Sequence, residues 1–268
     1  MSGFDIGWLD LREPVDRRAR NIDLLRKAVA FIEMTPERFV VDIGSGTGST
    51  FRAITPHLSR PIHWRLIDHD PLLLQEATRR HGNDGLVTCQ AGDLNDIARL
   101  PLDQASIVTA SALFDLCSLG FIEALAERLT EAKVGLYGAL NYCGEIRFHP
   151  AHPDDATMLA LFNRHQLSDK GFGVALGPQA TNVLQKVFSD KGLHVEVGNS
   201  DWIIDETAVE LHRAFVEGMV KALAETGELS DQTIAEWLDY RFGTTETGHC
   251  RVTHADFLAL PVESELKR

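Results

Sequence analysis

The stretch FVVDIGSGTGST, residues 39–50, carries the most chemical information in the chain. A short apolar run leads to Asp42, and glycines follow at 44, 46 and 48, so a backbone without side chains can approach a ligand closely. A dinucleotide-binding GxGxxG turn would need glycine at position 49, which is Ser49, and no lysine follows to make a phosphate loop. A carboxylate beside the turn repels a pyrophosphate and suits a ligand that carries an amine.

Two further carboxylates follow later apolar runs. Asp68 ends RLID, and Asp93 lies in AGDLND. A carboxylate at the position of Asp68 accepts both hydroxyl protons of a ribose, which is equally useful for a nicotinamide cofactor. The next apolar run ends in ASALFDL, where Ser111 faces the same edge of the expected sheet.

In these four motifs the chain resembles the class I S-adenosylmethionine-dependent methyltransferases, over about residues 35–142. The resemblance implies that S-adenosyl-L-methionine is the cofactor, with the acidic glycine turn at its methionyl part, Asp68 at its ribose, Asp93 and Leu94 at its adenine, and Ser111 below its sulfonium. The cofactor-binding residues it implies are Asp42, Gly44, Ser45, Gly46, Gly48, Asp68, His69, Asp93, Leu94 and Ser111.

Three residues are candidates for catalysis. Asp115 can orient an acceptor molecule or cap the next helix, and Tyr142 can donate to a polar acceptor or belong to the core. His165, in FNRHQLSDKGFG, can serve as a base or satisfy carbonyl groups at a helix end. Methyl transfer needs a general base only where the acceptor is protonated.

Three arginines near the start of the chain, Arg17, Arg18 and Arg20, can reach the cofactor carboxylate if the N-terminal helix folds over the cleft; otherwise they form a solvated face. The segment HPAHPDD has histidines and aspartates, but its spacing matches no recognised ligand pattern, and we expect no metal.

Short apolar runs alternate with helical patterns, which predicts a doubly wound α/β fold. We expect a mostly parallel seven-stranded sheet with helices on both faces, an N-terminal helix over residues 16–32 and a fifth strand ending at Tyr142. The expected organisation is a helical cap at 1–36 and a methyltransferase domain at 37–268. Within that domain we expect a lid-like acceptor-site insertion at 143–180 and a helical insertion at 205–243.

Composition narrows the substrate. The formal net charge is −13, so nucleic-acid phosphates would repel the chain. The first residues show no secretory signal, no apolar run is long enough for a membrane span, and four scattered cysteines fit a reducing cytoplasm. We therefore expect a cytoplasmic enzyme that transfers a methyl group to oxygen, nitrogen or carbon of a small molecule, with a homodimer as one option for its assembly. Two alternatives stay open: a non-catalytic methyltransferase-like subunit, and an NAD(P)-dependent dehydrogenase.

Overall fold

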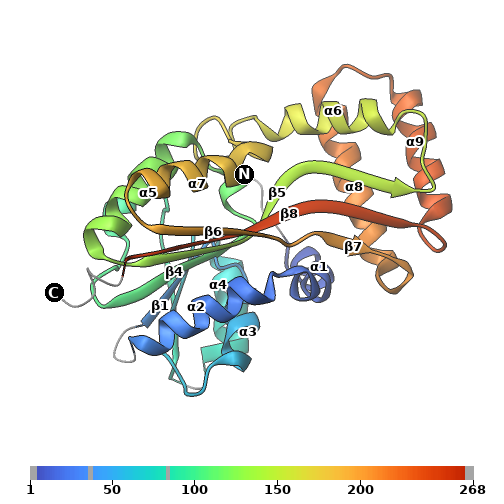
Figure 1. Cartoon of the computed structure of the whole chain (residues 1–268). Helices are drawn as coiled ribbons and strands as arrows, with labels where there is room; N and C mark the ends of the chain where they lie inside the picture. The colour runs from blue at the N-terminus through green and yellow to red at the C-terminus, as the bar shows by residue number, and fades with distance from the viewer. Residues whose placement is uncertain (1–4, 36–38, 83–84, 263–268) are drawn as a thin grey trace.

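The computed structural model describes residues 5–35, 39–82 and 85–262. Its centre is an eight-stranded sheet in the order β3-β2-β1-β4-β5-β8-β6, with β7 paired to β8 (Figure 1). Strands β1 to β5 are parallel, and β8 runs antiparallel to β5, β6 and β7. The strands are β1 (Phe39–Ile43), β2 (Trp64–Asp68), β3 (Val87–Ala91), β4 (Ala105–Ser111), β5 (Gly135–His149), β6 (His194–Asn199), β7 (Trp202–Ile204) and β8 (His249–Leu260).

Helices cover both faces of the sheet, which confirms the expected doubly wound fold. Helices α5 and α7 lie on one face, and α2, α3 and α4 lie on the other (Figure 1). The helices are α1 (Ile6–Ala19), α2 (Ile22–Met34), α3 (Ser49–Ile54), α4 (Pro71–His81), α5 (Leu119–Ala132), α6 (Asp155–Gln166), α7 (Ala180–Asp190), α8 (Val209–Thr226) and α9 (Asp231–Thr244). Among the described residues, no helix is both long and apolar enough to cross a membrane.

Two of the predicted elements are each divided in two. The expected helix over residues 16–32 is instead α1 and α2, which meet at Arg20 and Asn21 because Asn21 caps α2 by accepting from the Leu24 amide. The expected sixth strand is interrupted at Ser200 and Asp201, so the sheet has eight strands rather than seven. The expected boundary between residues 36 and 37 lies outside the described residues.

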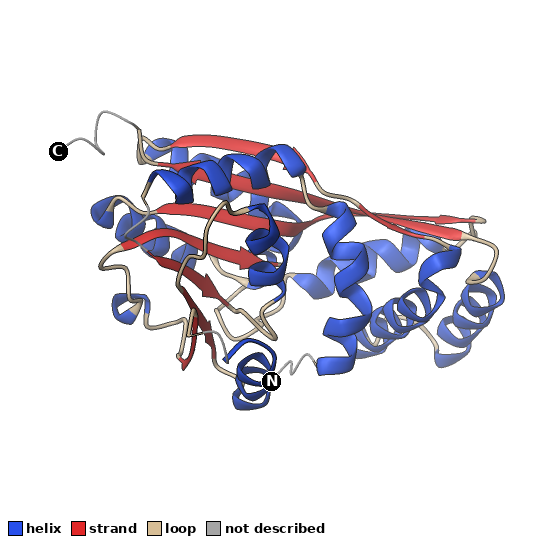
Figure 2. Ribbon diagram, turned by 90° about the horizontal axis from the view of Figure 1, so that it is seen from below, coloured by secondary structure: helices blue, strands red, loops and turns tan. Residues whose placement is uncertain are grey.

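The fifth strand does not end at Tyr142, contrary to expectation. It continues to His149, where it pairs with His249 of β8, so residues 143–149 are strand rather than irregular connection. The extended part of β5 and β8 projects beyond the central sheet, together with α6, α8 and α9 (Figures 1 and 2). Buried Met158, Trp237 and Leu223 pack on it and belong to the same apolar cluster as the residues under α2, so the projection continues the core of the central sheet.

The irregular point in β5 lies at its middle, where the pairing with β8 shifts between Gly138 and Asn141. Leu140 adopts φ +58°, and its amide donates to the buried carboxylate of Asp256, 2.9 Å away. The change in register marks the point where β5 leaves the central sheet, directly beside the carboxyl end of β4.

Candidate functional site

The glycine turn links β1 to α3 at the carboxyl edge of the parallel strands. Gly44 and Gly46 have φ +59° and +53°, which disfavours any residue with a side chain. A Cβ atom at Gly46 would lie 3.2 Å from Leu9 Cδ1, and one at Gly44 would lie 3.2 Å from Leu113 Cδ1. The turn is thus bare backbone enclosed by apolar side chains.

The two acids on β1 and β2 lie behind this turn, and both are buried. Asp68 accepts the Gly46 amide at 2.8 Å through one carboxylate oxygen and the Asp70 amide at 3.0 Å through the other. Each oxygen keeps a further lone pair for a hydroxyl donor. Asp42 accepts from Thr109 Oγ1 at 2.7 Å, and its burial raises its pKa to about 7 against the lowering effect of that hydrogen bond.

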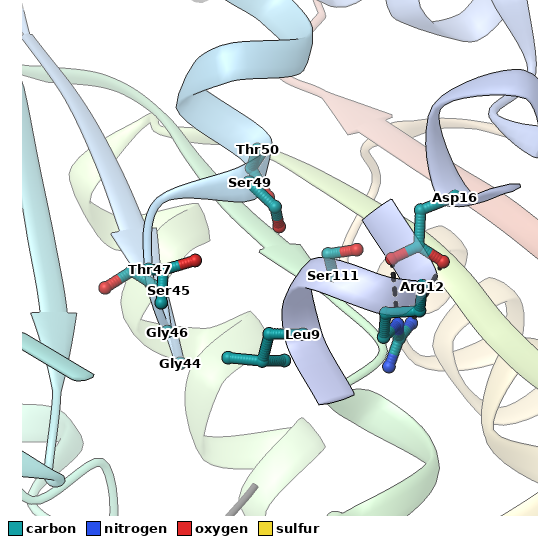
Figure 3. Close-up of a pocket in the computed structure, with 10 residues that line it drawn as sticks. All are labelled: Leu9, Arg12, Asp16, Gly44, Ser45, Gly46, Thr47, Ser49, Thr50 and Ser111. Atoms are coloured by element: carbon teal, nitrogen blue, oxygen red, sulfur yellow. Dashed lines mark hydrogen bonds and ion pairs between the residues drawn. The ribbon is translucent and has the colours of Figure 1, made fainter. Parts of the chain in front are cut away.

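Helix α1 lies across the turn and closes a small pocket with it (Figure 3). From α1 come Leu9, Arg12 and Asp16, and Arg12 forms an ion pair with Asp16 at 2.8 Å. The cavity volume is about 40 Å³. The other lining residues are Gly44, Ser45, Gly46, Thr47, Ser49, Thr50 and Ser111.

Arg20, at the joint between α1 and α2, is only 6% exposed and lies behind Ser111. Its Nη2 donates to Ser111 Oγ at 3.2 Å, while its Nε and Nη1 have no hydrogen-bond partner among the described residues. Ser45 Oγ is likewise buried without a partner there. A buried guanidinium with unused donors is suited to bind a carboxylate.

The acid after β3 has a different setting. Asp93 is exposed and accepts from the amide and side chain of Asn95 at 2.9 and 3.1 Å. Asn95 also donates to the Gly171 carbonyl at 3.0 Å, which brings the segment after α6 beside this loop. Leu94 is buried in the apolar cluster under α5, and His69 is exposed, with its Nδ1 3.4 Å from Asp68.

Two of the three predicted catalytic residues lie close together. Asp115 follows β4 and accepts a hydrogen bond from the Tyr142 amide, but its buried Oδ1 has no partner among the described residues. Burial raises its pKa to about 6. It does not cap α5, because Ser118 does. The Tyr142 hydroxyl donates to Asn163 Oδ1 at 2.8 Å, and Asn163 in turn donates to the Gly144 carbonyl.

The third, His165, lies at the end of α6 and faces α8. Its Nε2 is 2.7 Å from Glu225, and its Nδ1 is 3.5 Å from Lys170 Nζ. The structure therefore does not place His165 among the residues lining the pocket under α1.

Sequence reasoning missed the contribution of Leu9, Arg12 and Asp16. Helix α1 has a Pro14 inside it and few apolar residues, so its helical period is weak. Asn163 was missed as well, although it lies two residues before the singled-out His165. The sequence around a polar residue in a weakly amphipathic helix does not indicate which distant side chain it contacts, here that of Tyr142.

No protein-family model matches this chain, and no curated protein does. Among solved structures, the YcgJ protein of Bacillus subtilis is 15% identical, with a TM-score of 0.53, and the match covers 90% of this chain and all of that one. A methyltransferase of Geobacter sulfurreducens, solved with S-adenosyl-L-homocysteine, is 18% identical with a TM-score of 0.47, covering 91% and 92%. A geranyl diphosphate C-methyltransferase of Streptomyces coelicolor is 13% identical with a TM-score of 0.43, covering 88% and 77%.

The likeness to the YcgJ protein concerns the fold alone. Together with the strand order around β1 and β4, it identifies the architecture as a Rossmann-like α/β fold.

Proposed function

We propose that this protein is an S-adenosylmethionine-dependent methyltransferase that acts on a small molecule. One observation carries the proposal: a buried carboxylate, Asp68, binds the amide of Gly46 where the acidic glycine turn meets the end of β2. Through this hydrogen bond, the residue that we expect to bind the ribose lies beside the turn that we expect to bind the methionyl part of the cofactor. The net charge of −13 favours a small acceptor over a nucleic acid.

The residues present fit the proposed cofactor. Asp68 has lone pairs for ribose hydroxyls, the turn at Gly44 and Gly46 exposes backbone, and Arg20 has unused donors for a carboxylate. Buried Asp42 favours a nearby ammonium group, which would offset the cost of its ionisation. Ser45, Gly48 and Ser111 complete the methionyl side, and His69, Asp93 and Leu94 the nucleoside side. The cofactor supplies an activated methyl group, so the chain has to align the acceptor and exclude water.

We assign the acceptor side to Asp115 and Tyr142 at the ends of β4 and β5. The unpartnered Oδ1 of Asp115 can accept a proton from a hydroxyl or ammonium acceptor. Tyr142 donates its own proton to Asn163, so its oxygen is left to accept a hydrogen bond from the acceptor molecule.

His165 is the weaker assignment, since Glu225 and Lys170 already occupy both ring nitrogens. If it acts in turnover, His165→Ala lowers kcat and leaves the affinity for S-adenosylhomocysteine unchanged. Equal turnover in both proteins would assign His165 to structure.

The test is calorimetric titration of the full chain with S-adenosylmethionine, S-adenosylhomocysteine, NAD and NADP, followed by methyl transfer from labelled cofactor across a panel of small hydroxyl and amine acceptors. Binding of the sulfonium cofactor and a labelled product support the proposal. NAD binding without S-adenosylmethionine binding would favour a dehydrogenase, and cofactor binding without turnover on any acceptor would favour a non-catalytic subunit.

A further inference from the structure

We infer that α1 is a lid over the cofactor site, and that two arginine–carboxylate pairs latch it closed. This inference rests on the proposed function for the identity of the ligand. It assigns a role to Asp10, Glu13, Arg52 and Arg80, none of which belongs to the glycine turn or to the acids behind it.

The cavity under α1 is too small for the proposed cofactor. Pockets for drug-sized ligands usually enclose about 300–1,000 Å³. The cavity between α1 and the glycine turn, where we place only the methionyl part of the cofactor, encloses about 40 Å³. Leu9 of α1 approaches the turn so closely that a Cβ on Gly46 would lie 3.2 Å from it. A cofactor seated on Gly44 and Gly46 therefore requires α1 to move away from the turn.

Two arginine–carboxylate pairs hold α1 against α3 and α4. Glu13 binds Arg52 of α3 through both carboxylate oxygens, with Nε 2.7 Å from Oε1, and Arg52 also donates to the Thr47 carbonyl of the turn. Asp10 binds Arg80 of α4 through both oxygens, at 2.8 and 2.9 Å. Paired hydrogen bonds of this kind fix orientation, yet the Asp10 carboxylate is 46% exposed, so water can replace its pair at low cost.

Helix α1 has fewer buried residues than α2. Only Val15 and Asp16 of α1 are buried, while α2 buries an apolar face that includes Leu25, Phe31 and Ile32. Segments with little buried apolar surface open at the lowest free energy.

The surroundings of α1 are consistent with movement. On its far side a groove of about 320 Å³ separates Leu11 and Pro14 from the residues that begin α8. At its C-terminal end, Arg20 is buried and the Asn21 amide donates to Asp256 at 2.9 Å. The joint is thus fixed to the core. Asp16, four residues before Arg20, also accepts from Trp202 Nε1 at 2.8 Å, so the part of α1 that we infer to pivot is its N-terminal part, with Leu9, Asp10 and Glu13.

The experiment compares wild type with the double variant Asp10→Asn, Glu13→Gln. The matched control is Glu196→Gln, which removes an ion pair between Lys27 of α2 and β6, remote from the lid. S-adenosylhomocysteine is the probe. Its association is followed by stopped-flow tryptophan fluorescence, because Trp8 of α1 lies 6.4 Å from Trp202, centroid to centroid. Hydrogen exchange of residues 6–19 and 22–34 is measured with and without the probe.

We expect association about fivefold faster in the double variant, since each partly exposed pair contributes modestly, and the wild-type rate in the control. Exchange of residues 6–19 should be faster in the double variant than in wild type and should slow when the probe binds, while residues 22–34 stay protected throughout. Unchanged association together with equal protection of α1 and α2 would make α1 a fixed wall. Lack of probe binding by wild type would overturn the proposed function instead, and faster exchange of α1 in the unliganded double variant would still support the latch.

Discussion

At the scale of single residues, Asp68 combines a structural and a binding role. Its carboxylate orders the glycine turn through the Gly46 amide and still has lone pairs for a ligand. Asp42 lies beside it with a pKa raised to about 7, chiefly because burial disfavours its charged form, and the nearby charge of Asp68 adds to this effect. Such a cluster favours a ligand with both hydroxyl and ammonium groups.

Replacement of Asp68 by asparagine tests the ribose assignment. Asparagine keeps one acceptor oxygen for the turn but loses the charge and one acceptor, so we expect the Kd for S-adenosylhomocysteine to rise about 10- to 100-fold, as for hydrogen bonds to charged groups. Isothermal titration gives the Kd, and circular dichroism checks the fold. Asp96→Asn, which removes an exposed carboxylate nearby, is the control. An unchanged Kd in Asp68→Asn would remove Asp68 from the ribose site.

The pH dependence of turnover tests Asp115. A base must be ionised, and burial raises the pKa of this carboxyl to about 6, so wild-type kcat should increase with pH through about 6 and level off above it. In Asp115→Asn we expect kcat to fall about 100-fold or more and to lose that ionisation. A variant with the same pH profile as wild type would show that another group, or no group, takes the proton.

At the scale of elements, the strands of the central sheet can be predicted from the sequence. Most are short runs of mainly buried residues, so their own residues carry the signal. Residues 39–43 and 105–111 are mostly apolar runs, with Asp42 in the first and Ser106, Thr109 and Ser111 in the second, and such runs indicate buried parallel strands. The extension of β5 could not be predicted in this way. In residues 143–149 only Ile146 is buried, so a strand held by pairing to β8 resembles a polar loop. The position of α1 was equally hidden, since polar pairs hold it together with a few apolar contacts of Trp8, Leu11 and Val15 that form no regular pattern in the sequence.

His212 on α8 gives a prediction about the projecting element. Both ring nitrogens are buried without a partner among the described residues, the ring stacks on Phe148, and burial lowers its pKa to about 4, with Arg241 adding to the effect. The folded state thus binds a proton less readily than the unfolded chain, whose histidine has a pKa near 6.5. The free energy of unfolding is therefore highest above pH 6.5 and decreases as pH falls from 6.5 to 4, by about 2–3 kcal/mol.

In His212→Phe that decrease should be smaller by the same amount, because phenylalanine keeps the stacking and cannot bind a proton. Urea unfolding of both proteins at pH 7.5 and pH 4.5 measures the difference. His254 also has a pKa lowered to about 4 by burial and remains in both proteins, so its contribution cancels. Equal losses in the two proteins would mean that His212 is solvated or paired.

At the scale of the whole molecule, one buried carboxylate connects segments that are far apart in the sequence. Asp256 of β8 is fully buried and accepts from the Tyr137 hydroxyl, the Leu140 amide and the Asn21 amide, at 2.8 to 2.9 Å. It thus joins the α1–α2 joint to the irregular point of β5, and the buried Arg20 lies in its field. No local sequence pattern predicts this role for Asp256, because only the tertiary fold brings its hydrogen-bond partners together.

Asp256→Ala leaves three donors without their acceptor and removes one of the two carboxylates, Asp256 and Asp16, whose charges raise the pKa of the buried Arg20. We expect a loss of about 3–5 kcal/mol in the free energy of unfolding, because each unsatisfied buried donor costs about 1–3 kcal/mol, measured by urea denaturation at pH 7.5. Tyr137→Phe is the matched control, because it removes a single hydrogen bond and should cost about 1 kcal/mol. If Asp256→Ala were no more destabilising than Tyr137→Phe, water would be replacing the carboxylate. In that case the α1–α2 joint would not depend on Asp256 for its attachment to the sheet, and the pivot assigned to α1 would need a different anchor.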